Sequence, residues 1–217
     1  VVIGYLSHDP DPQNPRENDN LGVMACWHRR YNLGDQHDHK APQQLWASLL
    51  GEEYEQLYEA SEAEFTAWLN AHPDISYGTT SCSDYINESD RQLRQQVQER
   101  LTARGYVILP LYLYDHSGIT ISTGSFGDIW DSGQVGYIYA GPEEAKKLGA
   151  KPGEIEKCLQ GEVKEYDRYL RGECYGVCVE VFGADGEHLE DDACWNFLGT
   201  EYAQQEVMNR VGTLSFA

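Results

Sequence analysis

Residues 106–114, YVILPLYLY, form the longest apolar run of the chain and decide its fold class. Apolar continuity of this kind is typical of a strand buried on both faces, although Pro110 removes one backbone donor and indicates an edge or a bulge. Residues 119–123 and 134–140 follow with strand composition, and no helical segment separates them. Strands that follow one another without crossover helices pair antiparallel, so this region predicts an antiparallel sheet.

Working outward from this run, the remaining segments predict helices and further strands on both sides. Strand composition recurs at residues 1–6, 21–31, 173–182 and 193–198. Helical spacing or cap and breaker residues predict helices over 41–50, 52–71, 89–104, 142–149, 154–170 and 200–211. Because strands and helices do not alternate as βαβ units, we predict an α+β fold, with a mainly antiparallel sheet flanked by helices. We expect a single domain over residues 1–217, with a helix-rich insertion at about 41–104.

The composition indicates a folded protein of the cytoplasm. The chain has 217 residues, 41% of them hydrophobic, which is enough to bury a core. No stretch approaches the roughly 18 uninterrupted apolar residues of a membrane helix, and no signal peptide is visible. The six cysteines include no CxxC pair, and a chain of this size needs no disulfides, so we expect reduced thiols.

Charge is the most distinctive bulk property. The chain carries 36 acidic and 16 basic residues, a net charge of −20. Direct nucleic-acid binding is not expected, because phosphate contacts are made with Lys and Arg; a basic protein surface suits the sign better. The acids are concentrated: residues 51–104 hold eleven against four bases, and residues 183–217 hold seven against one.

Two clusters of carboxylates are therefore candidate partner-binding residues. The first cluster lies on the predicted helix 52–71 and comprises Glu52, Glu53, Glu55, Glu59, Glu62 and Glu64. The second follows the turn at residues 184–187 and comprises Glu187, Glu190, Asp191 and Asp192. Helical residues three or four apart lie roughly 5–6 Å from one another, so a glutamate row can imitate a line of phosphates. An ordinary solvated surface is the alternative.

Three segments carry a resemblance to known sequences. They are NPRENDNLG at 14–22 followed by CWHRRYNLGD at 26–35, YDHSGI at 114–119, and WDSGQVG at 130–136. Together they resemble a family of proteins encoded by phages and mobile elements, which supplies a genetic setting and no catalytic residue. Small acidic proteins in that setting are often inhibitors of host defence, some of them DNA mimics. The resemblance and the charge together predict an inhibitor that binds a basic host protein and requires no cofactor.

The polar loop at residues 9–20 is a candidate cation site. Its oxygen-bearing side chains are Asp9, Asp11, Asn14, Glu17, Asp19 and Asn20. Calcium and magnesium take oxygen ligands of these types, but the spacing does not fit an EF-hand loop. A solvated loop built on Asx turns is the alternative interpretation.

A second candidate metal site uses nitrogen and sulfur ligands. Cys26 and His28 share one face of the predicted strand 21–31, and His37 and His39 follow. These four residue types suit zinc, although their spacing matches no common structural-zinc pattern. Cys26 and His28 also form a candidate nucleophile–base pair, which would need an orienting group such as Asp35 or Asp115.

The segment at residues 115–117 follows a predicted strand and contains Asp115 and His116. Loops at strand ends are where functional side chains gather, and Asp128 and Asp131 lie in the next glycine-rich loop. Turn formation by Ser-Gly pairs is the structural alternative. As a second functional hypothesis, the chain is a metal- or cysteine-dependent enzyme centred on the Cys26/His28 and Asp115/His116 segments.

Overall fold

The predicted α+β class is confirmed. The computed structural model describes residues 1–128 and 130–215, and within them it contains six α-helices and two sheets. One sheet has the strand order β1-β6-β7 and the other β2-β5-β3-β4. The strand pairs β1–β6, β6–β7, β2–β5 and β3–β4 all run antiparallel. The antiparallel character follows the prediction, whereas the strands divide between two sheets instead of forming one.

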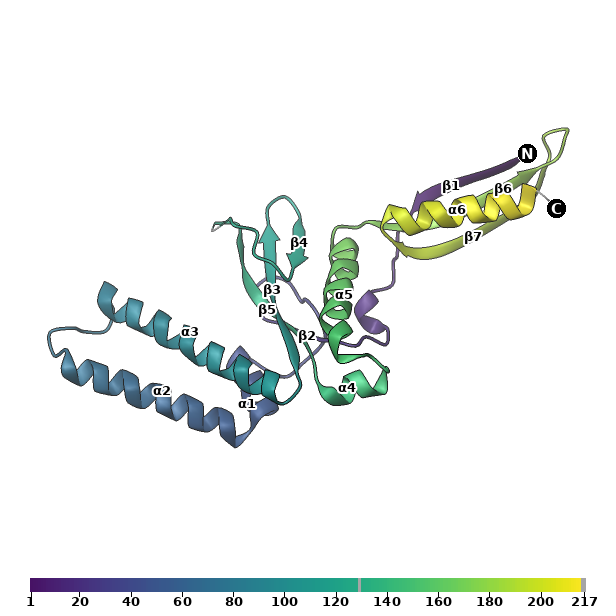
Figure 1. The fold of residues 1–217 in the computed structure, drawn as a ribbon. Coiled ribbons are helices and arrows are strands. Elements are labelled where there is room, and N and C mark those ends of the chain that lie inside the picture. Colours follow the sequence, from purple (N-terminus) through teal and green to yellow (C-terminus); the bar gives the residue numbers. More distant parts are fainter. Residues whose placement is uncertain (129, 216–217) are drawn as a thin grey trace. The chain divides into compact units, whose positions relative to one another are not determined.

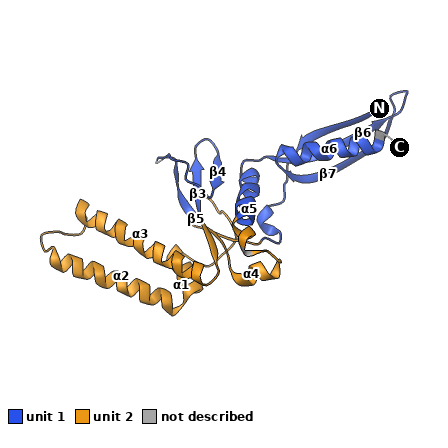
Figure 2. Ribbon diagram, viewed as in Figure 1, with its two compact units in different colours: residues 1–20, 110–135, 157–217 blue, residues 21–109, 136–156 orange. Residues whose placement is uncertain are grey.

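The chain packs as two compact units (Figure 2). Unit 1 comprises residues 1–20, 110–135 and 157–217, and unit 2 comprises residues 21–109 and 136–156. The boundary falls within β3 (Val107–Asp115) and β5 (Ser132–Ala140), so both strands contribute residues to each unit. The predicted single domain with an insertion at about 41–104 stays a prediction.

In unit 1, a helix covers the three-stranded sheet. The sheet is formed by β1 (Val2–His8), β6 (Cys174–Phe182) and β7 (His188–Leu198). Helix α6 (Thr200–Ser215) lies along it (Figure 1). The approach is close because β1 has glycine there: a Cβ on Gly4 would lie 2.7 Å from Val207 Cγ1.

Unit 1 also contains α5 (Ile155–Leu170), most of whose residues lie in this unit, β4 (Ile119–Ser122) and the short 3-10 helix η1 (Pro15–Glu17). Helix α5 buries Leu159, Val163 and Tyr166, which recur every three or four residues. Asp167 ties this helix to β4, because its carboxylate accepts hydrogen bonds from the hydroxyl of Thr120 and the backbone N–H of Ile121.

Unit 2 is built around a core to which both helices and strands contribute. It contains β2 (Val23–Cys26), α1 (Pro42–Leu50), α2 (Glu52–Ala71), α3 (Thr80–Ala103) and α4 (Pro142–Lys147). The 3-10 helix η2 (Pro152–Glu154) follows α4. The buried cluster of this core comprises Ala25, Leu45, Trp46, Leu50, Tyr54, Val97, Leu101 and Ile108.

Several element boundaries differ from the predictions. Helix α3 begins at Thr80 instead of Ser89, because Thr79 caps it by accepting a hydrogen bond from Cys82 N. The predicted strand 21–31 ends at Cys26, and the chain then folds back to form an isolated bridge between Ala25 and Gly34. Within the described residues, none of the helices has the length and apolar content that a membrane crossing requires.

Candidate functional site

Helices α2 and α3 form an antiparallel hairpin, and the side chains between them are aromatic residues and serines. The two helices lie side by side (Figure 1). Near the connecting turn, the ring of Tyr85 stacks on Trp68 at a centroid distance of 4.4 Å and on Phe65 at 5.7 Å. Farther along, the hydroxyls of Ser61 and Ser89 are 3.0 Å apart. These contacts fix which face of α2 remains in solvent.

Four glutamates form one row on that solvent face. Glu52, Glu55, Glu59 and Glu62 are all exposed and are spaced by three, four and three residues. At 1.5 Å of rise per residue, this α2 glutamate row spans about 15 Å. Glu64 is also exposed but lies outside the row's spacing. Helix α2 has no Lys or Arg, so the row carries four negative charges that no residue of its own helix offsets.

Some neighbouring acids, unlike those of the row, form ion pairs with arginine. Glu53 of α2 binds Arg104, the residue after α3, with 2.6 Å between carboxylate and guanidinium, and lies 3.4 Å from Arg100. On α3, hydrogen bonds from Arg91 and Gln92 lower the pKa of Glu88 to about 2. Among the described residues, no Lys, Arg or His forms an ion pair with the α2 glutamate row.

The second predicted acidic cluster lies in unit 1. Glu187 is in the turn before β7, and Glu190, Asp191 and Asp192 are exposed on that strand. Arg210 of α6 binds the carboxylate of Asp192 and also that of Glu206, so part of the charge is offset. The first cluster belongs to unit 2 and the second to unit 1.

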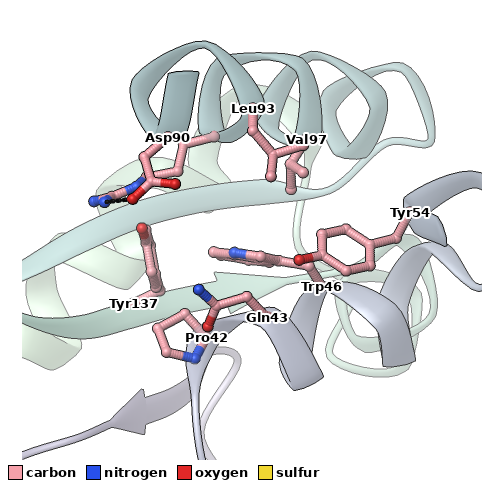
Figure 3. Close-up of a pocket in the computed structure, with 9 residues that line it drawn as sticks. Pro42, Gln43, Trp46, Tyr54, Asp90, Leu93, Val97 and Tyr137 are labelled. Carbon is pink, nitrogen blue, oxygen red and sulfur yellow. Dashed lines mark ion pairs between the residues drawn. The ribbon is translucent and has the colours of Figure 1, made fainter. Parts of the chain in front are cut away.

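A small pocket lies beside the base of the hairpin (Figure 3). Its volume is about 120 Å³. Trp46 of α1 and Tyr137 of β5 form an edge-to-face pair with ring centroids 4.6 Å apart. The full lining comprises Pro42, Gln43, Trp46, Tyr54, Asp90, Leu93, Arg94, Val97 and Tyr137. We call it the aromatic pocket; sequence patterns missed it because its walls come from α1, α2, α3 and β5.

The hydroxyl of Tyr54 is the unusual polar group of this pocket. The residue is only 4% exposed, and its oxygen is buried without a hydrogen-bond partner among the described residues. Burial raises the pKa of Tyr54, and the negative charges of Glu55 and Asp90 act in the same direction. A buried hydroxyl without a partner costs stability, because it gives up its hydrogen bonds to water on folding.

Replacing Tyr54 with phenylalanine is therefore expected to stabilise the protein. The change removes only the unpaired oxygen and should raise the free energy of unfolding by about 1 kcal/mol. Chemical denaturation measures the difference, with Tyr58→Phe as the control, since Tyr58 is 42% exposed and its hydroxyl can reach water. A loss of stability in Tyr54→Phe would show that the hydroxyl has a partner and would contradict this prediction.

The Cys26 and His28 segment lies in unit 2, where its histidines close turns. His28 Nδ1 accepts a hydrogen bond from Tyr31 N at 3.2 Å, and the two rings stack at 5.0 Å. His37 Nε2 lies 3.1 Å from the carbonyl oxygen of Cys26, so Nε2 donates the proton of this hydrogen bond. The Nδ1 of His37 is buried without a hydrogen-bond partner among the described residues. His39 stacks on His37 at 5.8 Å.

Asp115 and His116 lie in unit 1, at the end of β3. His116 Nδ1 is 3.0 Å from the Asp131 carboxylate, and both side chains are substantially exposed. Asp115 N donates to the backbone oxygen of Asp131. The N–H groups of Asp131 and Trp130 hydrogen-bond the Asp128 carboxylate and lower its pKa. These contacts stabilise the turn and leave the His116–Asp131 pair exposed.

The loop at residues 9–20 is tied to its unit by its own polar groups. Asp9 is 4% exposed, and its carboxylate accepts hydrogen bonds from the backbone N–H groups of Asp11 and Asn196, each at 3.1 Å. The Arg16 side chain is buried and pairs with Glu162 of α5 at 2.9 Å. Asp19 is exposed. These contacts match the Asx-turn alternative for this loop.

The metal hypotheses lack a ligand set in this geometry. Within residues 1–128 and 130–215, no group of three or more His, Cys, Asp or Glu side chains is placed to hold an ion. Cation binding at Asp9, Asp11 and Asp19, or at His37 and His39, stays a prediction. The residues of the enzyme hypothesis lie in different units: Cys26 and His28 belong to unit 2, whereas Asp115 and His116 belong to unit 1.

No protein-family model, curated protein or solved structure matches the chain. The function is therefore argued from the surfaces and pockets of the two units.

Proposed function

We propose that the chain is an acidic protein-binding inhibitor that presents the α2 glutamate row to a basic surface of its partner. The observation that carries the proposal is the row itself: four exposed carboxylates on one helix face, without a cation among the described residues to offset them. The resemblance to phage and mobile-element proteins makes a nucleic-acid-binding or defence protein of the host the proposed partner. The row then acts as a nucleic-acid mimic.

The charge density of the row supports mimicry. The row places four charges over about 15 Å of helix. One strand of duplex DNA carries a phosphate every 3.4 Å along the axis, which gives about four charges over the same length. A groove that binds phosphates through Lys and Arg therefore meets a similar line of charge on α2. The apolar side of α2 packs on α3, which keeps the row on a rigid support.

Neutralising the row should weaken partner binding. The test variant carries Glu52→Gln, Glu55→Gln, Glu59→Gln and Glu62→Gln, which keep side-chain size and remove four charges. The wild-type protein, immobilised, should capture a basic host protein at about 0.05 M salt and release it by about 0.5 M, because salt screens exposed charges. We expect the variant to bind at least about tenfold more weakly, a loss of about 1.4 kcal/mol.

A control variant removes the same number of exposed acids elsewhere. It combines Glu143→Gln, Glu154→Gln, Glu165→Gln and Asp74→Asn, so its net charge equals that of the test variant. This control should retain the partner. Equal losses in the two variants would show that net charge alone drives binding and would remove the role of the row.

A further inference from the structure

The aromatic pocket has walls that suit a flat cation. Trp46 is 6% exposed, and its indole meets Tyr137 edge to face, with Tyr54 beside it (Figure 3). Asp90, with its carboxylate, lines the same pocket. Aromatic faces attract cations through the ring quadrupole, and a nearby carboxylate adds a full opposite charge. The pocket thus combines both kinds of attraction in one small space.

The size of the pocket selects among cationic groups. Its volume is about 120 Å³, and a cavity of about 150 Å³ holds a six-carbon aromatic ring. A planar guanidinium with four heavy atoms fits this space, whereas a nucleobase is too large. Guanidinium also stacks on aromatic faces. It is more weakly hydrated than an ammonium ion, so its transfer from water into the pocket costs less hydration free energy.

We infer that the aromatic pocket receives an arginine side chain of the partner, which stacks on Trp46 and binds the Asp90 carboxylate. The inference rests on the proposed function, since it names a contact of the same basic partner. Helix α2 contributes Tyr54 to the pocket lining and also carries the α2 glutamate row. A basic partner bound to α2 can therefore contact both the row and the pocket.

The pocket already contains a weakly held cation of its own chain. Arg94 lies 3.9 Å from Asp90, and both side chains are more than half exposed. Exposed pairs of this kind contribute little, about 0–1 kcal/mol. An incoming guanidinium can therefore displace Arg94, which then competes with it instead of assisting.

The test uses a single amino acid as the probe. N-acetyl-arginine-N-methylamide is titrated into the full chain, and the indole N–H resonance of Trp46 is followed by NMR, with Trp46→Phe giving its assignment. We expect a saturable shift with a Kd on the order of 1–10 mM, which corresponds to roughly 3–4 kcal/mol. The citrulline analogue has the same shape without the charge and should bind at least about fivefold more weakly.

Two neighbouring substitutions give opposite predictions. Asp90→Asn removes the attracting charge and should weaken the arginine probe about threefold, whereas Arg94→Gln removes the competitor and should tighten it about threefold. Tyr54→Phe and Tyr58→Phe should both leave the affinity of the probe unchanged, because the Tyr54 hydroxyl is buried and Tyr58 does not line the pocket. An anion site would reverse the first two effects, and equal binding of arginine and citrulline probes would exclude a cation site; either result overturns the inference. An unresponsive Trp46 would mean that only water fills the pocket.

Failure here is distinct from failure of the proposed function, because the probe titration needs no partner. A Trp46 response without any basic partner in the capture experiment would leave the pocket standing and remove the proposed function. Capture that depends on the row, with an unresponsive Trp46, would remove the pocket inference alone.

Discussion

Replacing Gly136 with alanine is expected to destabilise the protein by about 3 kcal/mol, because the added methyl group has no space. Gly136 is opposite Cys26 in the antiparallel pairing of β5 with β2. A Cβ at this position would lie against the carbonyl oxygen of Ala25 and 2.9 Å from the Cα of Cys26. Both atoms belong to the backbone, so the strain cannot be relieved by a side-chain rotation and the two strands must separate.

The same strand supplies a matched control. Gly133 is exposed, and a Cβ built there meets nothing within 4 Å. Gly133→Ala should therefore change the free energy of unfolding by less than about 0.5 kcal/mol. Urea denaturation followed by circular dichroism measures both variants. Similar stabilities for Gly136→Ala and Gly133→Ala would show that β2 does not lie against β5 at this position.

Local patterns were sufficient for most elements of the fold. The prediction of a helix over 52–71 is confirmed to the residue, since Tyr54, Leu57 and Phe65 repeat at helical spacing and Pro73 follows the end. The start of α3 was missed because residues 80–88 are mostly polar. Ser89 has cap chemistry, yet in the folded chain its hydroxyl contacts Ser61 across the hairpin. A local pattern cannot separate a cap from an interhelical contact.

Local sequence patterns predict one of the two features of the candidate site and not the other. The α2 glutamate row follows from helical spacing alone, since Glu52, Glu55 and Glu59 share a face of any helix over 52–71. The aromatic pocket does not, because Trp46, Asp90 and Tyr137 are brought together only by the packing of segments far apart in the sequence. No spacing rule within one element encodes such a contact.

Arg16 shows the same limit in unit 1. The sequence places it in a polar, proline-rich loop, where an arginine is expected in solvent. In the structure its side chain is 2% exposed and pairs with Glu162 of α5, 146 residues away along the chain. The pair anchors the loop to the helix. A buried guanidinium is tolerated only while a carboxylate balances its charge, because the cost of removing the ion from water is large.

Replacing Glu162 with glutamine is therefore expected to destabilise the protein by about 3 kcal/mol. The substitution keeps the size of the side chain and removes a charge that balances the buried Arg16. Glu165→Gln on the same helix is the control, since Glu165 is exposed and its removal should change the free energy of unfolding by less than about 0.5 kcal/mol. Replacing both partners, as Arg16→Met with Glu162→Gln, should recover part of the loss, because no charge is then left buried. If the double variant were as unstable as the sum of the two single variants, the ion pair would contribute no coupling and the loop would be anchored by its other contacts.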